Sequence, residues 1–168
     1  MIKNNFKKNI IYIFLFILIF GVDRFSKLYI LNLAGTNESL NLFVTPFLNF
    51  YLIWNKGIAF GLFSFDHNFT YNFITFLIIA ITAIVLIIAF KSKDYKGYFF
   101  LSIFSGSVGN LYDRIYYSAV PDFIDFHYGN FHWFVFNVAD IFITIGITCL
   151  IIVEFFYNNK KKPNNEKI

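Results

Sequence analysis

The chain has 168 residues, of which 58% are hydrophobic and 23% aromatic, and its 14 Lys and Arg against 10 Asp and Glu give a net charge of +4. Only 14% of the residues are charged, whereas soluble domains carry about a quarter. So few charged residues could not cover a core of this hydrophobicity, which excludes a soluble globular domain. The low charge also excludes disorder, and a single cysteine excludes a disulfide scaffold within the chain. The composition predicts a small protein that crosses a membrane several times.

Four apolar stretches are long enough to cross the hydrocarbon core of a bilayer, which takes about 20 helical residues. They cover residues 10–31, 69–90, 97–116 and 135–157. The first follows a basic segment, as in a signal peptide, but Asp23, Arg24 and Lys27 stand where a cleavage site needs small residues. We therefore expect a retained first helix and a single polytopic membrane domain over residues 1–168.

The two longer connections, residues 32–68 and 117–134, differ in composition. The first contains short strand-like stretches at Leu42–Val44 and Phe50–Trp54, which predict a little β structure. The second is rich in Phe, Tyr and Trp, which favour the interface between membrane and water. We expect both connections to be outer loops.

Ten of the 14 basic residues are lysines in three clusters that flank the apolar stretches. The clusters are Lys3, Lys7 and Lys8; Lys91, Lys93 and Lys96; and Lys160, Lys161, Lys162 and Lys167. Four crossings place all three clusters on one side, and the positive-inside rule makes that side cytoplasmic, together with both termini. Nucleic-acid binding needs a continuous basic face instead, so no nucleic-acid partner is expected.

Polar side chains within or beside the apolar stretches are the informative exception, because they are costly in a membrane and usually face a cavity or the bundle interior. They are Asp23, Lys27, Asn55, Asn110, Asp113, Arg114, Asp122, Asn137 and Asp140. The expected topology places all of them toward the outer side, at one depth.

Spacing assigns these residues to helix faces. Asp23 and Lys27 are four apart in the order that favours a helical ion pair, although simple neutralisation near a helix end explains them equally well. One face of the third stretch carries Gly106, Asn110, Asp113 and Arg114. Close helix packing with an Asp113–Arg114 pair is the plainer explanation of that face.

Asp122 and Asp140 are the two carboxylates without an obvious local cation. Two carboxylates in a low-dielectric cavity share one proton, so that one can activate water as a base while the other polarises a carbonyl as an acid. This is peptide hydrolysis without a metal or a covalent intermediate. A solvated loop position remains the alternative for Asp122, and Asp125 is the alternative member of the pair.

Other chemistries lack their residue patterns. His127 and His132 are five apart and His67 is distant, so the spacing of a helical zinc protease is absent. Ser105 lies in no Gly-x-Ser-x-Gly elbow, and Cys149 lies mid-stretch as an apolar filler. We expect neither a metal nor a cofactor.

Five short motifs occur in a fixed order along the chain. They are Asp23-x-x-x-Lys27, Asn55-x-Gly57-x-Ala59-Phe60, Gly109-Asn110-x-x-Asp113-Arg114, Asp122-Phe123 and Phe136-Asn137-x-Ala139-Asp140. Together with the four spans, they closely resemble the bacterial lipoprotein signal peptidases (signal peptidase II) over about residues 23–143. The chain departs from the family pattern in having Ser105 before Gly106 and Pro121 before the first aspartate.

The resemblance implies an intramembrane aspartic endopeptidase of the bacterial inner membrane, with its active site near the outer face. Its substrate would be a prolipoprotein, cut just before a cysteine that carries diacylglycerol, and globomycin-type cyclic peptides would inhibit it. The implied fold is an all-α membrane protein of four transmembrane helices with a small extracytoplasmic β-cradle from the first outer loop. Membrane lipid would be a further partner.

The resemblance also implies roles for individual residues. Asp122 and Asp140 match the catalytic pair. Positions that match the surroundings of the substrate, or supporting positions, are Asp23, Lys27, Asn55, Gly106, Asn110, Asp113, Arg114 and Asn137. Two other functions are alternatives on the same residues: a proton- or ion-coupled carrier that uses Asp23, Asp113 and Asp140 as a relay, and a non-catalytic assembly or lipid-binding factor. A carrier needs polar groups through the whole membrane depth, which the inner halves of these stretches lack.

Overall fold

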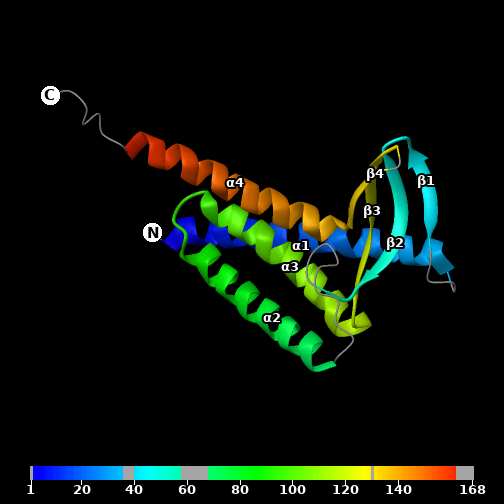
Figure 1. Cartoon of the computed structure of the whole chain (residues 1–168). Helices are drawn as coiled ribbons and strands as arrows, with labels where there is room; N and C mark the ends of the chain where they lie inside the picture. Colours follow the sequence, from blue (N-terminus) through cyan, green and yellow to red (C-terminus); the bar gives the residue numbers. More distant parts are fainter. Residues whose placement is uncertain (1, 36–39, 58–67, 130, 162–168) are drawn as a thin grey trace.

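A computed structural model describes residues 2–35, 40–57, 68–129 and 131–161 of the chain. Within these ranges the helices and strands follow in the order α1 (Ile2–Ala34), β1 (Asn41–Thr45), β2 (Leu48–Asn55), α2 (Asn68–Lys91), α3 (Lys96–Tyr117), β3 (Val120–Tyr128), β4 (Phe131–Phe136) and α4 (Val138–Lys161). The strands form a small sheet at one end of the helices, and the start of α1 and the end of α4 lie at the other end (Figure 1). Ala59, Phe60 and His67 lie outside the described residues.

Three helices are long and apolar enough to cross a membrane within the described part of the chain. Their apolar segments are Phe6–Ala34, Tyr71–Lys91 and Val138–Phe156. Their outer faces expose many isoleucine and phenylalanine side chains, which is the surface expected of helices that face lipid. The fold is therefore a mostly helical, membrane-embedded one with a small antiparallel sheet.

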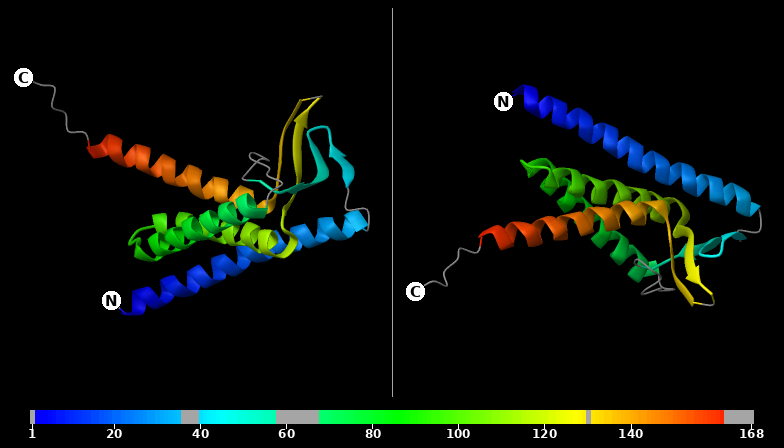
Figure 2. Two further views of the ribbon diagram at one scale, coloured as in Figure 1. Left: turned by 60° about the horizontal axis from the view of Figure 1, so that its bottom comes forward. Right: turned by 90° about the horizontal axis from the view of Figure 1, so that it is seen from above.

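Helix α3 lies among the other three helices and contacts each of them, as two further views make clear (Figure 2). Its glycines allow this close approach, as the small-residue face predicted. A Cβ on Gly106 would lie only 2.6 Å from the Ala139 carbonyl oxygen, and a Cβ on Gly109 only 2.6 Å from the Oδ2 atom of Asp23. Because its faces meet protein, α3 can carry more polar residues than its neighbours.

The sheet differs from the one expected. Its strands run antiparallel in the order β1-β2-β3-β4, so only half of it comes from the first outer segment. Strands were expected only in the first outer connection, but residues 117–134 also contain strand structure, because β3 pairs with β2 and thereby satisfies backbone groups that β2 would otherwise leave open. The fourth helix begins at Val138 and not at residue 135, since β4 continues to Phe136. Helix α1 begins well before residue 10.

Two buried apolar clusters connect these layers. Near the sheet, Ile30 and Ala34 of α1 pack with Leu52 of β2 and Phe123 of β3. At the opposite end, Tyr12 packs with residues of α2 and α3, and its hydroxyl donates to the Ala89 carbonyl oxygen over 3.0 Å. The first cluster fixes the sheet on the end of α1 and so places β3 beside the start of α4.

Candidate active site

The two predicted aspartates lie at the junction of the sheet and the helices. Asp122 is on β3 and is 3% exposed, so the solvated-loop alternative is wrong. Asp140 lies in the first turn of α4. Both line one cavity of about 300 Å³, together with Asn55, Asn110, Arg114 and Asn137. The structure thus brings most of the predicted site residues into a single cavity.

Two asparagines hold the carboxylate of Asp122. The Nδ2 atom of Asn55 donates to its Oδ2 atom over 2.9 Å, and the Nδ2 atom of Asn137 donates to its Oδ1 atom over 2.6 Å. Asn55 is itself fixed, because its Oδ1 atom accepts the backbone N–H of Gly57 at 2.9 Å. The carboxylate therefore has one defined orientation at the end of β3.

Asp140 is held from a helix and from its own backbone turn. The Nδ2 atom of Asn110 donates to its Oδ1 atom over 2.9 Å, and the backbone N–H of Asn137 donates to its Oδ2 atom over 3.1 Å. In return, the backbone N–H of Asp140 donates to the Oδ1 atom of Asn137 over 3.2 Å. Such a reciprocal arrangement is a capping box, which satisfies the free N–H groups at a helix start.

The side-chain amides of Asn55, Asn110 and Asn137 are all oriented in the same way. Each side-chain oxygen accepts from a fixed donor: the Gly57 N–H, the Lys27 ammonium or the Asp140 N–H. Each amide nitrogen must then point the other way, toward a carboxylate oxygen. The hydrogen bonds therefore determine which end of each amide faces the aspartates, and they place hydrogen-bond donors around both carboxylates.

The environment raises the pKa of Asp122 to about 7, and burial of the carboxylate is the largest cause. The negative charge of Asp140 raises this pKa further, whereas the hydrogen bonds from Asn55 and Asn137 lower it. A carboxyl group of this kind still holds its proton near neutral pH. Asp122 and Asp140 can therefore share one proton, so that one carboxyl acts as an acid while the other acts as a base.

A buried ion network lies beneath the cavity. Lys27, Asp23 and Asp113 are all fully buried, and the Lys27 ammonium lies 2.9 Å from Asp23 and 2.6 Å from Asp113. Arg24 completes the network, with Nη1 of its guanidinium 2.6 Å from the Oδ1 atom of Asp113. The ion pair expected from the spacing of Asp23 and Lys27 is confirmed. The predicted Asp113–Arg114 pair is wrong, because Asp113 pairs with Lys27 and Arg24 instead.

This network supports the site through two hydrogen bonds. The Lys27 ammonium donates to the Oδ1 atom of Asn110 over 2.9 Å and thereby orients the amide that holds Asp140. The Oδ1 atom of Asp23 accepts the backbone N–H of Ala139 over 3.0 Å, at the start of α4. Asp23 and Lys27 therefore position the residues that hold the carboxylates.

Arg114 places a cation at the wall of the cavity. Its guanidinium lies 5.7 Å from the ring centre of Tyr71, whose hydroxyl donates to the Arg114 carbonyl oxygen over 3.0 Å. The buried Nη1 atom of Arg114 has no hydrogen-bond partner among the residues that the structure describes. This guanidinium can therefore donate to a ligand oxygen in the cavity.

A second, apolar cleft of about 480 Å³ adjoins the first and shares Asp140 and Thr144 with it. Its other lining residues are Phe126, Trp133, Phe134, Phe136, Ile141 and Ile145. Asp125, the alternative member of the pair, instead accepts a 2.8 Å hydrogen bond from the ring of His132 and is not among the residues that line either cleft.

Comparisons with known proteins show which family and which solved structure this chain is similar to. The family model described as Signal peptidase (SPase) II matches residues 15–156. A lipoprotein signal peptidase of Pelagibacter ubique is 54% identical over 99% of both chains, and one of Fusobacterium nucleatum is 34% identical over 92% of both. A solved bacterial membrane enzyme superposes with a TM-score of 0.71 at 28% identity, covering 93% of this chain and 94% of its own.

Proposed function

The chain belongs to the signal peptidase II family, whose members are aspartic peptidases that remove signal peptides from prolipoproteins, and we propose that Asp122 and Asp140 are its catalytic pair. The observation that carries this proposal is the common cavity in which three asparagines orient both carboxylates. The cavity is also lined by Asn55, Asn110, Asn137 and Arg114. Four further residues do not line it but position residues that do, through hydrogen bonds, ion pairs or close helix packing: Asp23, Lys27, Asp113 and Gly106.

The proposed reaction uses one water molecule and the single shared proton. The ionised carboxylate removes a proton from water as the water oxygen attacks the scissile carbonyl carbon, and the protonated carboxyl donates to the carbonyl oxygen. In the second step a hydroxyl of the tetrahedral intermediate returns a proton to the carboxylate that had donated one, and the C–N bond breaks. The leaving nitrogen receives the proton that the other carboxyl had taken from water, so the pair again holds one shared proton. Arg114 donates a hydrogen bond to an oxygen of the substrate backbone and so holds the peptide in line.

The substrate that we propose is a prolipoprotein whose cysteine carries diacylglycerol, cut on the N-terminal side of that cysteine. The apolar cleft that shares Asp140 and Thr144 with the catalytic cavity supports this choice, because acyl chains need an apolar surface next to the scissile bond. A globomycin-type cyclic peptide would occupy the same cavity and contact the two aspartates.

We further propose that α3 also crosses the membrane, so that residues 1–168 form one polytopic domain of four spans in the bacterial inner membrane. The lysines at the start of α1, between α2 and α3, and at the end of α4 support a cytoplasmic position for both termini. The sheet, whose strand β3 carries Asp122, and the first turn of α4, which carries Asp140, lie at the opposite end of the helices, which corresponds to the outer face (Figure 1).

The decisive experiment is cleavage of a diacylglyceryl-modified prolipoprotein by purified protein in detergent. Asp122→Asn and Asp140→Asn are each expected to abolish cleavage while the protein still inserts and purifies normally. Asp94→Asn is the matched control, because this exposed carboxylate accepts from the Lys96 N–H at the other end of the helices. Wild-type activity in either active-site variant would disprove the assignment of the pair.

A further inference from the structure

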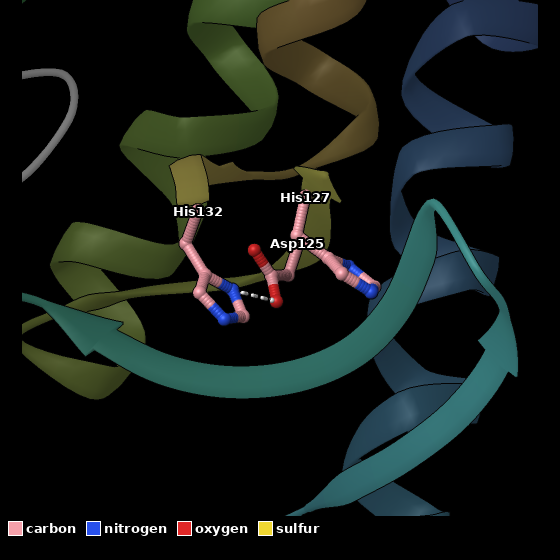
Figure 3. Close-up of side chains that lie close together, drawn as sticks. All are labelled: Asp125, His127 and His132. Atoms are coloured by element: carbon pink, nitrogen blue, oxygen red, sulfur yellow. Dashed lines mark hydrogen bonds and ion pairs between the residues drawn. The ribbon is translucent and has the colours of Figure 1, made fainter. Parts of the chain in front are cut away.

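Asp125, His127 and His132 form a second cluster of titratable side chains, on the hairpin of β3 and β4 (Figure 3). His127 and His132 are directly opposed in the strand register, and their rings stack with centroids 5.2 Å apart. One potential ligand atom from each of the three residues lies within 4.8 Å of the other two. The carboxylate of Asp125 lies between the two imidazole rings in this view.

The hydrogen bonds within the cluster leave two buried atoms unsatisfied. Asp125 is 2% exposed, and its Oδ2 atom receives the 2.8 Å hydrogen bond from Nδ1 of His132. Its Oδ1 atom and the Nδ1 atom of His127 are both buried without a hydrogen-bond partner among the described residues. A buried polar atom without a partner is destabilising, so these two atoms mark a place for a ligand. A simple Asp125–His132 ion pair leaves both of them unexplained.

We propose that Asp125, His127 and His132 bind a divalent transition-metal ion of the zinc class. Two imidazole nitrogens and one carboxylate oxygen suit Zn²⁺, and imidazole nitrogens disfavour Mg²⁺ and Ca²⁺, which prefer oxygen ligands. Three protein ligands leave a fourth position for water, and the side chain of His132, which is 56% exposed, leaves the cluster open to solvent.

The distances are compatible with such an ion after small side-chain movements. Tetrahedral zinc with bonds of about 2.1 Å needs its ligand atoms about 3.4 Å apart, so separations of up to 4.8 Å must shorten by up to about 1.4 Å. His132 is the exposed member and can rotate, whereas Asp125 is fixed by burial. The spacing of the two histidines, which excludes a helical zinc-protease motif, becomes a cross-strand pair on a hairpin.

The role of the ion follows from the position of the hairpin. Asp122 lies three residues before Asp125 on β3, and β4 leads directly into Asn137, which holds the Asp122 carboxylate. An ion bound by Asp125, His127 and His132 would cross-link β3, which carries Asp122, to β4, which leads into Asn137. It would stabilise the hairpin without touching the reacting atoms. The inference does not depend on the assignment of the catalytic pair.

Metal binding can be measured directly on the full chain in detergent, stripped with EDTA and freed of any histidine purification tag. We expect one equivalent of Zn²⁺ to remain after equilibrium dialysis, and Co²⁺ to give the visible absorption bands of a four-coordinate site. His132→Gln and Asp125→Asn should each raise the Kd for Zn²⁺ by about 100-fold or more. Asp94→Asn should leave that Kd unchanged.

Thermal unfolding supplies a second readout, which separates loss of the site from loss of the fold. Zn²⁺ is expected to raise the Tm of the unmodified chain and not that of His132→Gln, while the two proteins unfold at similar temperatures in EDTA. Less than one bound equivalent, equal competition by Mg²⁺, or a Kd in either ligand variant equal to that of the unmodified chain would overturn the proposal. Each result stands apart from the prolipoprotein cleavage assay.

Discussion

Asn137 and Asp140 close a reciprocal pair of hydrogen bonds at the start of α4, in which the backbone N–H of each residue donates to the side-chain oxygen of the other, over 3.1 and 3.2 Å. The same Asn137 side chain donates from Nδ2 to Asp122 over 2.6 Å. One asparagine therefore caps a membrane helix and joins the two proposed catalytic carboxylates. Helix stability and active-site geometry depend here on a single side chain.

The two roles of Asn137 can be separated by substitution. Asn137→Ala should lower the free energy of unfolding by about 1 kcal/mol, because it removes the cap, whereas Asn137→Ser keeps a capping oxygen and should keep most of that stability. Neither variant can donate an amide hydrogen to Asp122, so both should lower kcat by about 100-fold through loss of orientation. Thermal unfolding and prolipoprotein cleavage measure the two effects. Normal kcat in Asn137→Ser would show that the amide contact is dispensable.

The raised pKa of Asp122 predicts how activity depends on pH. Since this pKa is about 7, the pair loses its shared proton as the pH rises through neutrality, and kcat/KM should then fall about tenfold per pH unit. Cleavage of the lipidated substrate at fixed detergent concentration, from pH 5 to about 9, measures this fall of kcat/KM with rising pH. A flat profile across neutrality would mean that no proton on Asp122 is needed.

The same pKa predicts the pH dependence of stability. Between the ordinary pKa of 3.8 and about 7, the folded chain holds a proton on Asp122 that the unfolded chain has already released. The free energy of unfolding should therefore decrease as the pH rises through this range and level off above about 7. Asp122→Asn lacks this proton, so its Tm relative to the unmodified chain should rise between pH 5 and about 8. Parallel Tm curves for the two proteins would contradict the assignment.

Lys27 balances two buried carboxylates, and its removal leaves them without their shared ammonium. Lys27→Met should lower the free energy of unfolding by about 3–5 kcal/mol, which is typical for breaking a buried pair on one side. It should also reduce kcat, because Asn110 loses the donor that orients its amide toward Asp140. Lys96→Met is the matched control, since it removes an exposed ion pair with Glu154 and should change stability little. Equal Tm values for the two variants would contradict a structural role for Lys27.

The sequence was most informative where charge is scarce. In a chain with so few ionisable groups, each polar residue beside an apolar stretch was a site candidate, and the expected common depth brought Asp122, Asp140, Asn55 and Asn110 together correctly. The lengths of the apolar stretches likewise predicted α2 and α3 to within a residue or two of their ends. Both signals are local, so they can be read without knowledge of the fold.

Contacts between distant segments were missed. Strands β3 and β4 exist because β3 pairs with β2, about 70 residues earlier, and aromatic residues alone did not reveal that pairing. Arg24 pairs with Asp113, a contact between α1 and α3 that no local spacing in the sequence indicates. One local signal does mark a boundary: Asn137 and Asp140 have the spacing of a capping box, which places the start of α4 at Val138.

Gly106 tests whether the close contact between α3 and α4 sustains the site. In Gly106→Ala the new methyl group would lie 2.6 Å from the Ala139 carbonyl oxygen, a backbone atom that cannot move without shifting the first turn of α4. Since Asp140 lies in that turn, we expect a lower Tm and a kcat reduced by about 100-fold. Gly21→Ala is the matched control, because a Cβ there meets nothing within 4 Å and alanine favours the helix by up to about 1 kcal/mol. Its Tm should be equal or higher, with normal cleavage. Similar behaviour of the two variants would show that α4 can move away from α3 without disturbing Asp140.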